Sequence, residues 1–314
     1  MFSYRHAFHA GNHADVLKHT VLIAILKHLT EKNAALTVVD THAGAGLYRL
    51  DGDYSAKGGE AADGIIKLFA ALAPANGTPA AIQNVAPCLQ DYLDMIVSFN
   101  TGGKLKVYPG SPFVIQNLLR EAARDKLKLF ELHPTDHKAL TDNIAQLEAG
   151  RQVAVARLDG FEGLKSFLPP PVSATGSRRA LVLIDPSYEI KNDYAKVSAS
   201  LQDSLKRFST GSYAVWYPVI PRPEAHELPR RLKTLATQAG KPWLHATLNI
   251  GQPPEMSAVT LPDERAPRPG LTASGMFVIN PPHTLKAALN AALPQMLEVL
   301  ARGKGKGWTV EAGG

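Results

Sequence analysis

The chain has 314 residues, 45% of them hydrophobic and 20% charged, with a formal net charge of +6 and a single cysteine, Cys88. This size and apolar content indicate a globular protein with one large domain, or one domain with an insertion, and exclude global disorder. One cysteine excludes an intrachain disulfide framework, and no segment resembles a membrane span or a secretory signal, so we expect a cytoplasmic monomer without membrane contact.

The first 50 residues contain an arm, a helix, a strand and a turn. The arm, residues 4–13, is rich in histidine. The broad apolar face of residues 14–29 predicts a helix, and residues 36–40 predict a strand. A glycine-rich turn follows at 40–46, Asp-Thr-His-Ala-Gly-Ala-Gly. These elements form the expected start of the main domain.

Residues 51–103 interrupt this pattern, because they contain helical periodicity at 65–72 and 82–99 around a Pro/Gly-rich stretch. We predict a small inserted helical subdomain there, with the main domain continuing over 104–302. The glycine- and lysine-rich residues 303–314 predict a flexible tail.

Strands and helices alternate again after the insertion. Strands are expected at 105–108, 127–132, 153–158, 180–184, 213–219, 244–250 and 275–279. Helices are expected at 113–123, 136–147, 161–167, 194–208, 225–239 and 285–301. This alternation predicts an α/β fold with a mostly parallel sheet flanked by helices. In such sheets, ligands bind beyond the carboxyl ends of the strands.

The most informative motif is Asp185-Pro186-Ser187-Tyr188, which directly follows the apolar run 180–184. The Asp185 carboxylate and the Pro186 carbonyl can accept hydrogen bonds from an exocyclic amine, while Tyr188 stacks on the ring that bears it. The motif therefore predicts nucleobase chemistry. A positive net charge fits a polyanionic partner, although many proteins of other functions share it.

The turn at 40–46 supports a nucleotide-like cofactor, because glycines such as Gly44 and Gly46 let the backbone approach a ligand closely. The dinucleotide fingerprint requires a third glycine, and Arg49 stands at that position. This disfavours a nicotinamide oxidoreductase. The pattern D-x-x-x-G-x-G from Asp40 instead matches the sulfonium-cofactor loop of methyltransferases, and a plain strand-to-turn connection explains it as well.

Further acidic residues close the next strands. Glu131 lies at the end of the expected strand 127–132 and is suited to bind ribose hydroxyls, and Asp159 with Gly160 follows 153–158 and could accept from an adenine amine. A helix cap or a surface charge explains either acid alone. Acids at successive strand ends, followed by Asp185, favour one shared site.

Three other motifs have simpler explanations. Asn280-Pro-Pro-His283 resembles the amine-binding tetrapeptide, but its prolines are better explained as the end of the last strand. His9 and His13 lack the further ligands of a zinc site, so we expect no metal. Ser111, in Tyr108-Pro-Gly-Ser111-Pro, lies outside any nucleophile elbow, and a helix-capping role suffices for it.

Taken together, these strings form a known set. They are residues 4–19, the turn at 40–46, Tyr108-Pro-Gly-Ser111-Pro, Glu131-Leu-His-Pro, Asp159-Gly160-Phe and residues 271–276. In this order they resemble the bacterial 23S rRNA (adenine(2030)-N6)-methyltransferase J family, from residue 1 to about residue 285. The resemblance is specific, and only the insertion and the C-terminal tail match loosely.

The resemblance implies an S-adenosylmethionine-dependent methyltransferase with a Rossmann-like class I fold, acting on an adenine N6 of 23S rRNA without a metal. Asp185 would be the catalytic acceptor, assisted by the arm residues Tyr4, His6 and Lys18. Cofactor contacts would come from the matching positions, which are His19, His42, Ser111, Glu131, Asp159 and Gly160.

One position departs from the family, which usually has Asp-Pro-Pro-Tyr where this chain has Ser187 in third place. The lost proline removes a φ restraint, so we expect a looser loop and weaker turnover. Two alternatives stay open besides a nicotinamide enzyme. They are a DNA adenine-N6 methyltransferase and a catalytically weak RNA-binding homologue.

Overall fold

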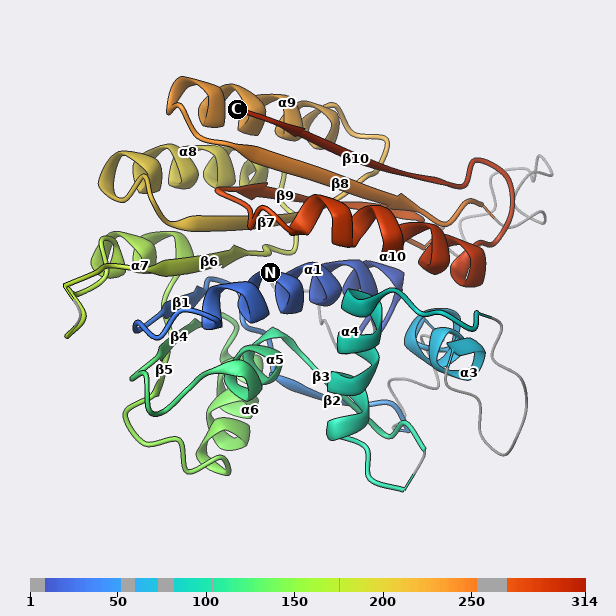
Figure 1. Cartoon of the computed structure of the whole chain (residues 1–314), viewed down its shortest axis with the longest axis horizontal. Helices are drawn as coiled ribbons and strands as arrows, with labels where there is room; N and C mark the ends of the chain where they lie inside the picture. Colours follow the sequence, from blue (N-terminus) through green and yellow to red (C-terminus); the bar gives the residue numbers. More distant parts are fainter. Residues whose placement is uncertain (1–8, 52–59, 73–81, 103, 175, 253–269) are drawn as a thin grey trace.

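A computed structural model describes residues 9–51, 60–72, 82–102, 104–174, 176–252 and 270–314. Its main feature is an eight-stranded sheet with the order β10-β8-β9-β7-β6-β1-β4-β5 (Figure 1). Strands β5, β4, β1, β6 and β7 are parallel neighbours, whereas β9 and β10 run against the strands that flank them. Among the described residues, no helix is long and apolar enough to span a membrane.

The strands of the chain are short in the first half and longer in the second. They are β1 (Thr37–Asp40), β2 (Leu47–Arg49), β3 (Val107–Pro109), β4 (Lys126–Phe130), β5 (Val153–Ala156), β6 (Ala180–Ile184), β7 (Ser212–Pro218), β8 (Trp243–Asn249), β9 (Ala273–Ile279) and β10 (Gly307–Gly313). The helices are α1 (His13–Thr30), η2 (Ala62–Ile66), α3 (Lys67–Leu72), α4 (Pro87–Ser98), α5 (Ser111–Leu118), α6 (Pro134–Ala145), α7 (Gly160–Phe167), α8 (Asn192–Arg207), α9 (Pro223–Gln238) and α10 (Leu285–Leu300).

Helices cover both faces of the sheet, as the Rossmann-like fold requires. Strand residues alternate between two cores: Leu181 and Leu183 of β6 pack in one, Val182 and Ile184 in the other. The first core includes α1, α5 and α10, and the second includes α7, α8 and α9 (Figure 1). All five residues of β6 are buried because helices lie on both of its faces, which explains its uninterrupted apolar sequence.

Helix α1 lies in the centre of the first core. Its N-terminus is capped by Asn12, whose Oδ1 accepts from the backbone N–H groups of Ala14 and Asp15. It contacts α4, α5 and α10 as well as the sheet, so it is apolar almost all round. This burial also encloses polar side chains, among them Lys18 and His19, which are 4% and 0% exposed.

The segment between β2 and β3 contains η2, α3 and α4, which pack against α1 and α10 (Figure 1). At its base, β2 and β3 form a separate antiparallel pair. The expected strand at 105–108 is therefore present as β3, but it lies outside the main sheet. The sequence prediction missed β2, which has only three residues.

The flexible tail predicted at 303–314 is wrong, because residues 307–313 form β10. This strand pairs with β8 along its whole length, and Trp308 and Val310 pack against the first core. Glycines and lysines dominate the start of the segment and suggested a loose chain. After Gly307 the side chains alternate between the core and the solvent, as in a strand, and this strand forms the edge of the sheet.

Candidate functional site

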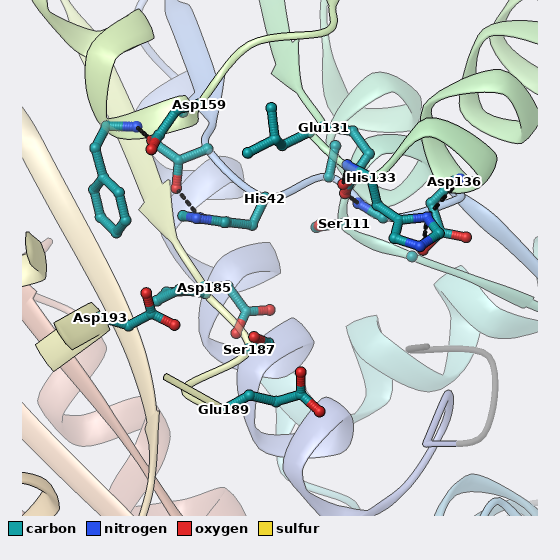
Figure 2. Close-up of a pocket in the computed structure, with 18 of the residues that line it drawn as sticks. His42, Ser111, Glu131, His133, Asp136, Asp159, Asp185, Ser187, Glu189 and Asp193 are labelled. Carbon is teal, nitrogen blue, oxygen red and sulfur yellow. Dashed lines mark hydrogen bonds and ion pairs between the residues drawn. The ribbon is translucent and has the colours of Figure 1, made fainter. Parts of the chain in front are cut away.

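Four carboxylates lie at the carboxyl ends of neighbouring parallel strands. In sheet order they are Asp159 after β5, Glu131 after β4, Asp40 at the end of β1, and Asp185 after β6. A cavity of about 220 Å³ opens at this edge, lined by Asp159, Glu131 and Asp185, while Asp40 is fully buried. Figure 2 shows Asp159, Glu131 and Asp185 around this cavity, and a shared ligand-binding role for the four acids stays a prediction.

The glycine-rich turn forms part of the cavity wall. Gly44 has a φ of +61°, and a Cβ on it would lie 2.3 Å from the Tyr48 hydroxyl oxygen. That hydroxyl accepts from the Ala45 N–H at 3.1 Å, and the Gly44 N–H donates to Glu131 at 2.8 Å. A side chain at position 44 would therefore disrupt the turn, so the glycine is required by close approach as well as by φ. Gly46, with a φ of +81°, lies in the same turn.

Glu131 and Asp159 are held by backbone donors. Glu131 accepts from the N–H groups of His133 and Gly44, and burial raises the pKa of its carboxyl. Asp159 caps α7 by accepting from the Phe161 N–H at 2.9 Å. Both side chains nevertheless line the cavity. Glu131 lies on the same side of it as His133 and Asp136 (Figure 2). The helix-cap interpretation and the ligand-site interpretation of Asp159 are thus compatible.

Gly160 packs directly under the first strand. A Cβ at this position would lie 2.0 Å from the Thr41 carbonyl oxygen, so only glycine fits between α7 and the end of β1. This contact brings Asp159 beside the turn that carries His42. The His42 ring meets the edge of the Phe161 ring at 5.0 Å between centroids, and burial lowers the pKa of His42 to about 4. His42 is therefore neutral at pH 7.

Asp40 and Ser111 form a buried pair beneath the cavity. The Ser111 hydroxyl donates to Asp40 at 2.6 Å. Burial raises the pKa of Asp40 to about 7, against the Ser111 hydrogen bond, which lowers it. The capping role expected for Ser111 is wrong: Gly110 is the N-cap of α5, without a side-chain bond, and the serine hydroxyl is engaged by Asp40.

His19 lies next to this pair, on α1. Its Nδ1 is 2.7 Å from the Tyr108 hydroxyl oxygen, and the two rings stack at 5.5 Å. His19 lines the cavity, whereas Tyr108 is buried behind it.

Lys18 joins Asp185 to α1 through a buried ion pair. Its Nζ lies 2.6 Å from an Asp185 oxygen and 2.7 Å from an Asp15 oxygen. Burial acts to lower the pKa of Lys18, but the charges of Asp15 and Asp185 outweigh burial and raise it. One ammonium therefore holds two carboxylates together across the core.

A second cavity, of about 370 Å³, lies on the other side of this ion pair. Lys18, Asp185, Ser187 and Glu189 line both cavities, so Asp185 stands in the wall that separates them. The second cavity is further lined by residues from several elements, among them His9, Asn12, Glu60, Trp216, Ile220, Arg222 and Leu271. A molecule in one cavity would thus face a molecule in the other across Asp185.

Tyr188, which the sequence predicts to stack on the amine-bearing ring, is buried in the structure. It is 2% exposed and packs against Tyr194 and Trp216, with ring centroids 4.6 and 6.0 Å away. Its hydroxyl donates to the Trp216 carbonyl at 2.7 Å, and its own carbonyl accepts from Arg222 at 3.0 Å. In this structure Tyr188 anchors the loop after β6, and a stacking role stays a prediction.

The remaining predicted residues separate into two groups. Tyr4 and His6 lie outside the described residues. Asn280 and His283 lie at the opposite end of the sheet, because β9 is antiparallel to β7 and Ile279 pairs with Tyr213 at the start of β7. Asn280 there donates to the carbonyls of Ser209 and Gly211.

Sequence reasoning missed several residues of the site. Asp15 could have been found from its spacing to Lys18, which places both on one helix face. Trp216 and Arg222 come from β7 and the loop before α9, far along the chain from Asp185. Within the described residues, no cluster of three or more His, Cys, Asp or Glu side chains is placed to hold a metal ion.

Comparisons with known proteins identify relatives over almost the whole chain. Residues 33–312 match the family model described as "Ribosomal RNA large subunit methyltransferase D, RlmJ". The chain is 41% identical over 294 residues to ribosomal RNA large subunit methyltransferase J of Escherichia coli K12, covering 94% of this chain and 92% of that protein. It is 39% identical over 312 residues to the protein of the same name from Haemophilus influenzae, covering 99% and 98%.

A solved structure supports the fold along the whole chain. The crystal structure of a Legionella pneumophila protein superimposes with a TM-score of 0.77 at 29% identity. The match covers 97% of this chain and 98% of that chain.

Proposed function

Because the chain belongs to the RlmJ family of ribosomal RNA large subunit methyltransferases, we propose that it transfers a methyl group from S-adenosylmethionine to N6 of an adenine in 23S rRNA. The first cavity, bounded by the glycine-rich turn, would bind the cofactor. The second cavity would receive the adenine. The partners proposed are this cofactor and 23S rRNA, with no metal.

The residues of the first cavity fit the proposed cofactor. Glu131, at the end of β4, offers a carboxylate to ribose hydroxyls, and Asp159 offers one to an adenine amine. Phe161 and Leu158 supply apolar surface beside Asp159. Gly44 lines the same cavity with backbone that carries no side chain. His19 and Ser111 also line this cavity.

Asp185 would act on the adenine amine. The bound cofactor supplies an electrophilic methyl group on a sulfonium. The N6 lone pair is delocalised into the adenine ring, so it is a poor nucleophile until its hydrogens are held. The Asp185 carboxylate and the Pro186 carbonyl would accept those hydrogens and localise the lone pair. Asp185 would take the proton late, because the amine becomes strongly acidic only as the methyl group arrives.

Lys18 would keep Asp185 in place for this step. Its ammonium contacts the Oδ2 atom of Asp185, which leaves Oδ1 as the oxygen available to the amine. Because Lys18 is also bound to Asp15, the carboxylate is fixed relative to α1 as well as to β6. Much of the rate would therefore come from orientation.

Trp216 contributes an aromatic side chain to the second cavity. Ile184 of β6 pairs with Val215 of β7. Asp185 and Trp216 each follow directly in the chain, so they lie beside one another. The Trp216 ring is half-buried, lines the cavity, and lies 5.8 Å from the Lys18 ammonium. A flipped adenine could contact this ring while its amine faces Asp185. Stacking on Trp216 would add about 1–3 kcal/mol.

The observation that carries the proposal is the position of Asp185 in the wall shared by the two cavities. The test is transfer of tritium from labelled S-adenosylmethionine to total rRNA, followed by nucleoside analysis. We expect label in N6-methyladenosine from the large-subunit RNA. Asp185→Ala should abolish it, while Asp203→Ala, an exposed acid on α8, should not.

Two other functions would give different results in the same assay. A DNA adenine methyltransferase would label duplex DNA in preference to rRNA fragments. A catalytically weak homologue, as the Ser187 substitution could produce, would retain RNA affinity without transfer. The family membership favours rRNA over both.

A further inference from the structure

The inserted helical segment is in direct contact with the turn that begins α1. The Ile65 N–H, in η2, donates to the Gly11 carbonyl at 2.8 Å. A Cβ on Gly64 would lie 2.1 Å from the Gly11 carbonyl oxygen and 2.7 Å from the Asn12 Cα. A Cβ on Gly11, which has a φ of +79°, would in turn lie 2.8 Å from Ile65. The two backbones therefore meet without intervening side chains.

Glu60 adds a polar contact at the same junction. Its carboxylate lies 2.9 Å from the His9 Nδ1 and accepts from the Asn12 Nδ2 at 2.9 Å. The hydrogen bond to Glu60 raises the pKa of the His9 imidazole. Glu60 also lines the second cavity, beside His9 and Asn12. The insertion thus forms part of the wall of the proposed adenine site.

A continuous chain of contacts runs from this junction to Asp185. Glu60 holds the amide nitrogen of Asn12, whose Oδ1 accepts from the Asp15 N–H at 3.0 Å. The Asp15 carboxylate accepts from the Gly11 N–H at 2.9 Å and binds Lys18 at 2.7 Å. Lys18 then binds Asp185 at 2.6 Å. Each step joins groups that are buried or half-buried.

We propose that Glu60 and Gly64 are positioning residues: the insertion clamps the first turn of α1, and this clamp sets the positions of Lys18 and Asp185 for methyl transfer. This inference rests on the proposed function. It assigns the insertion a role in the catalytic step in addition to any contact with RNA. A displacement of about 1 Å at reacting groups can reduce a rate by about a hundredfold.

The test compares Glu60→Ala, Glu60→Gln and Gly64→Ala with Asp94→Ala, which removes an exposed acid of α4 in the same insertion. Steady-state methyl transfer to an rRNA fragment gives kcat and KM, and calorimetric titration with S-adenosylmethionine gives the fraction of competent cofactor sites. We expect kcat to fall about tenfold or more in Glu60→Ala and Gly64→Ala, with the number of cofactor sites and the KM values unchanged. Glu60→Gln retains an oxygen for Asn12 and should recover part of the loss, and Asp94→Ala should match the wild type.

Hydrogen exchange provides a measurement that does not depend on the reaction. Amides of residues 14–18 should exchange faster in Glu60→Ala than in Asp94→Ala, because the cap of α1 is loosened. Unchanged exchange, or a kcat equal to that of Asp94→Ala, would overturn the proposal, as would a loss of cofactor sites in proportion to kcat. If the wild type fails to methylate rRNA, the proposed function fails, and the exchange measurement still decides whether the insertion holds α1.

Discussion

The Lys18 ammonium and the Asp185 carboxylate, 2.6 Å apart, form the partition between the two cavities of the candidate site. The ammonium comes from a buried helix and the carboxylate from the end of a buried strand. Because Asp15 binds the same ammonium, the partition contains two negative charges and one positive charge. Removing the positive charge should therefore affect both stability and catalysis.

We expect Lys18→Met to lower the free energy of unfolding by about 3 kcal/mol, because it leaves Asp15 and Asp185 buried without their counter-ion. Methyl transfer should be lost as well. Lys27→Met is the matched control, since Lys27 also binds a carboxylate, Asp91, at 2.6 Å, but with its side chain 51% exposed. Its effect should stay within about 1 kcal/mol in urea unfolding.

A second substitution separates the two effects of Lys18. Asp15→Asn combined with Lys18→Met should recover part of the lost stability, because it removes one of the stranded carboxylates. It should leave methyl transfer absent. If the double variant regained transfer, Lys18 would act only through the stability of the core.

Tyr188 allows a separate test of its anchoring contacts. Tyr188→Phe removes the hydrogen bond to the Trp216 carbonyl and should reduce the free energy of unfolding by about 1 kcal/mol. Tyr188→Ala also leaves a cavity among Tyr194 and Trp216 and should reduce it by about 3–5 kcal/mol. Thermal unfolding measures both. Equal losses in the two variants would contradict a core position for the ring.

The sequence predicted the parts of the site that depend on single strands. The apolar residues 180–184 placed Asp185 at a strand end, and the spacing of Asp40, Gly44 and Gly46 placed the turn. These predictions succeed because a buried parallel strand must be apolar along its length and must end at the ligand-binding edge. The roles of these residues in binding and transfer stay predictions.

Contacts between distant segments of the chain could not be predicted from such local patterns. Glu60 meets Asn12 because α1 and the insertion pack together, and neither local pattern contains that information. The motif that contains Tyr188 likewise does not show that Trp216 and Tyr194 pack against its ring. The strand β10 depends on the free edge of β8, which lies more than fifty residues earlier.

Arg222 is one such distant contact, and it stabilises an unusual backbone conformation. Tyr188 has a φ of +53°, which is unfavourable for a residue with a side chain. The Arg222 guanidinium donates to the Tyr188 carbonyl at 3.0 Å and also lines the second cavity. We expect Arg222→Met to reduce kcat about tenfold through the loop that carries Asp185, with little change in cofactor affinity.

The control for Arg222 is Arg230→Met, which removes an exposed arginine of α9, the helix that Arg222 precedes. Arg222→Lys tests geometry against charge, because lysine keeps the positive charge without the planar guanidinium. A kcat restored fully by lysine would show that charge alone is required. A tenfold loss of kcat in Arg230→Met would show that the assay responds to the total positive charge available for RNA binding, and not to the contact with Tyr188.

Asp40 should give the protein a characteristic pH dependence. Its pKa is raised to about 7 by burial, so the folded state holds a proton that the unfolded chain releases near pH 3.9. Stability from this group is complete below that lower value and is lost as the pH rises through about 7. Asp40→Asn has no titrating group at this position, so the stability of wild type relative to this variant should fall between about pH 4 and pH 7 and stay level above that range.

The difference between the two proteins isolates Asp40. His42 and His13, whose pKa values burial lowers to about 4, act in the opposite direction: their contribution is lost as the pH falls. These histidines are present in both proteins, so they cancel when urea midpoints are compared without cofactor. Ser111→Ala should extend the decline in stability to higher pH, because the hydroxyl that lowers the pKa of folded Asp40 is then absent. Parallel curves for wild type and Asp40→Asn would show that Asp40 is ionised throughout this range.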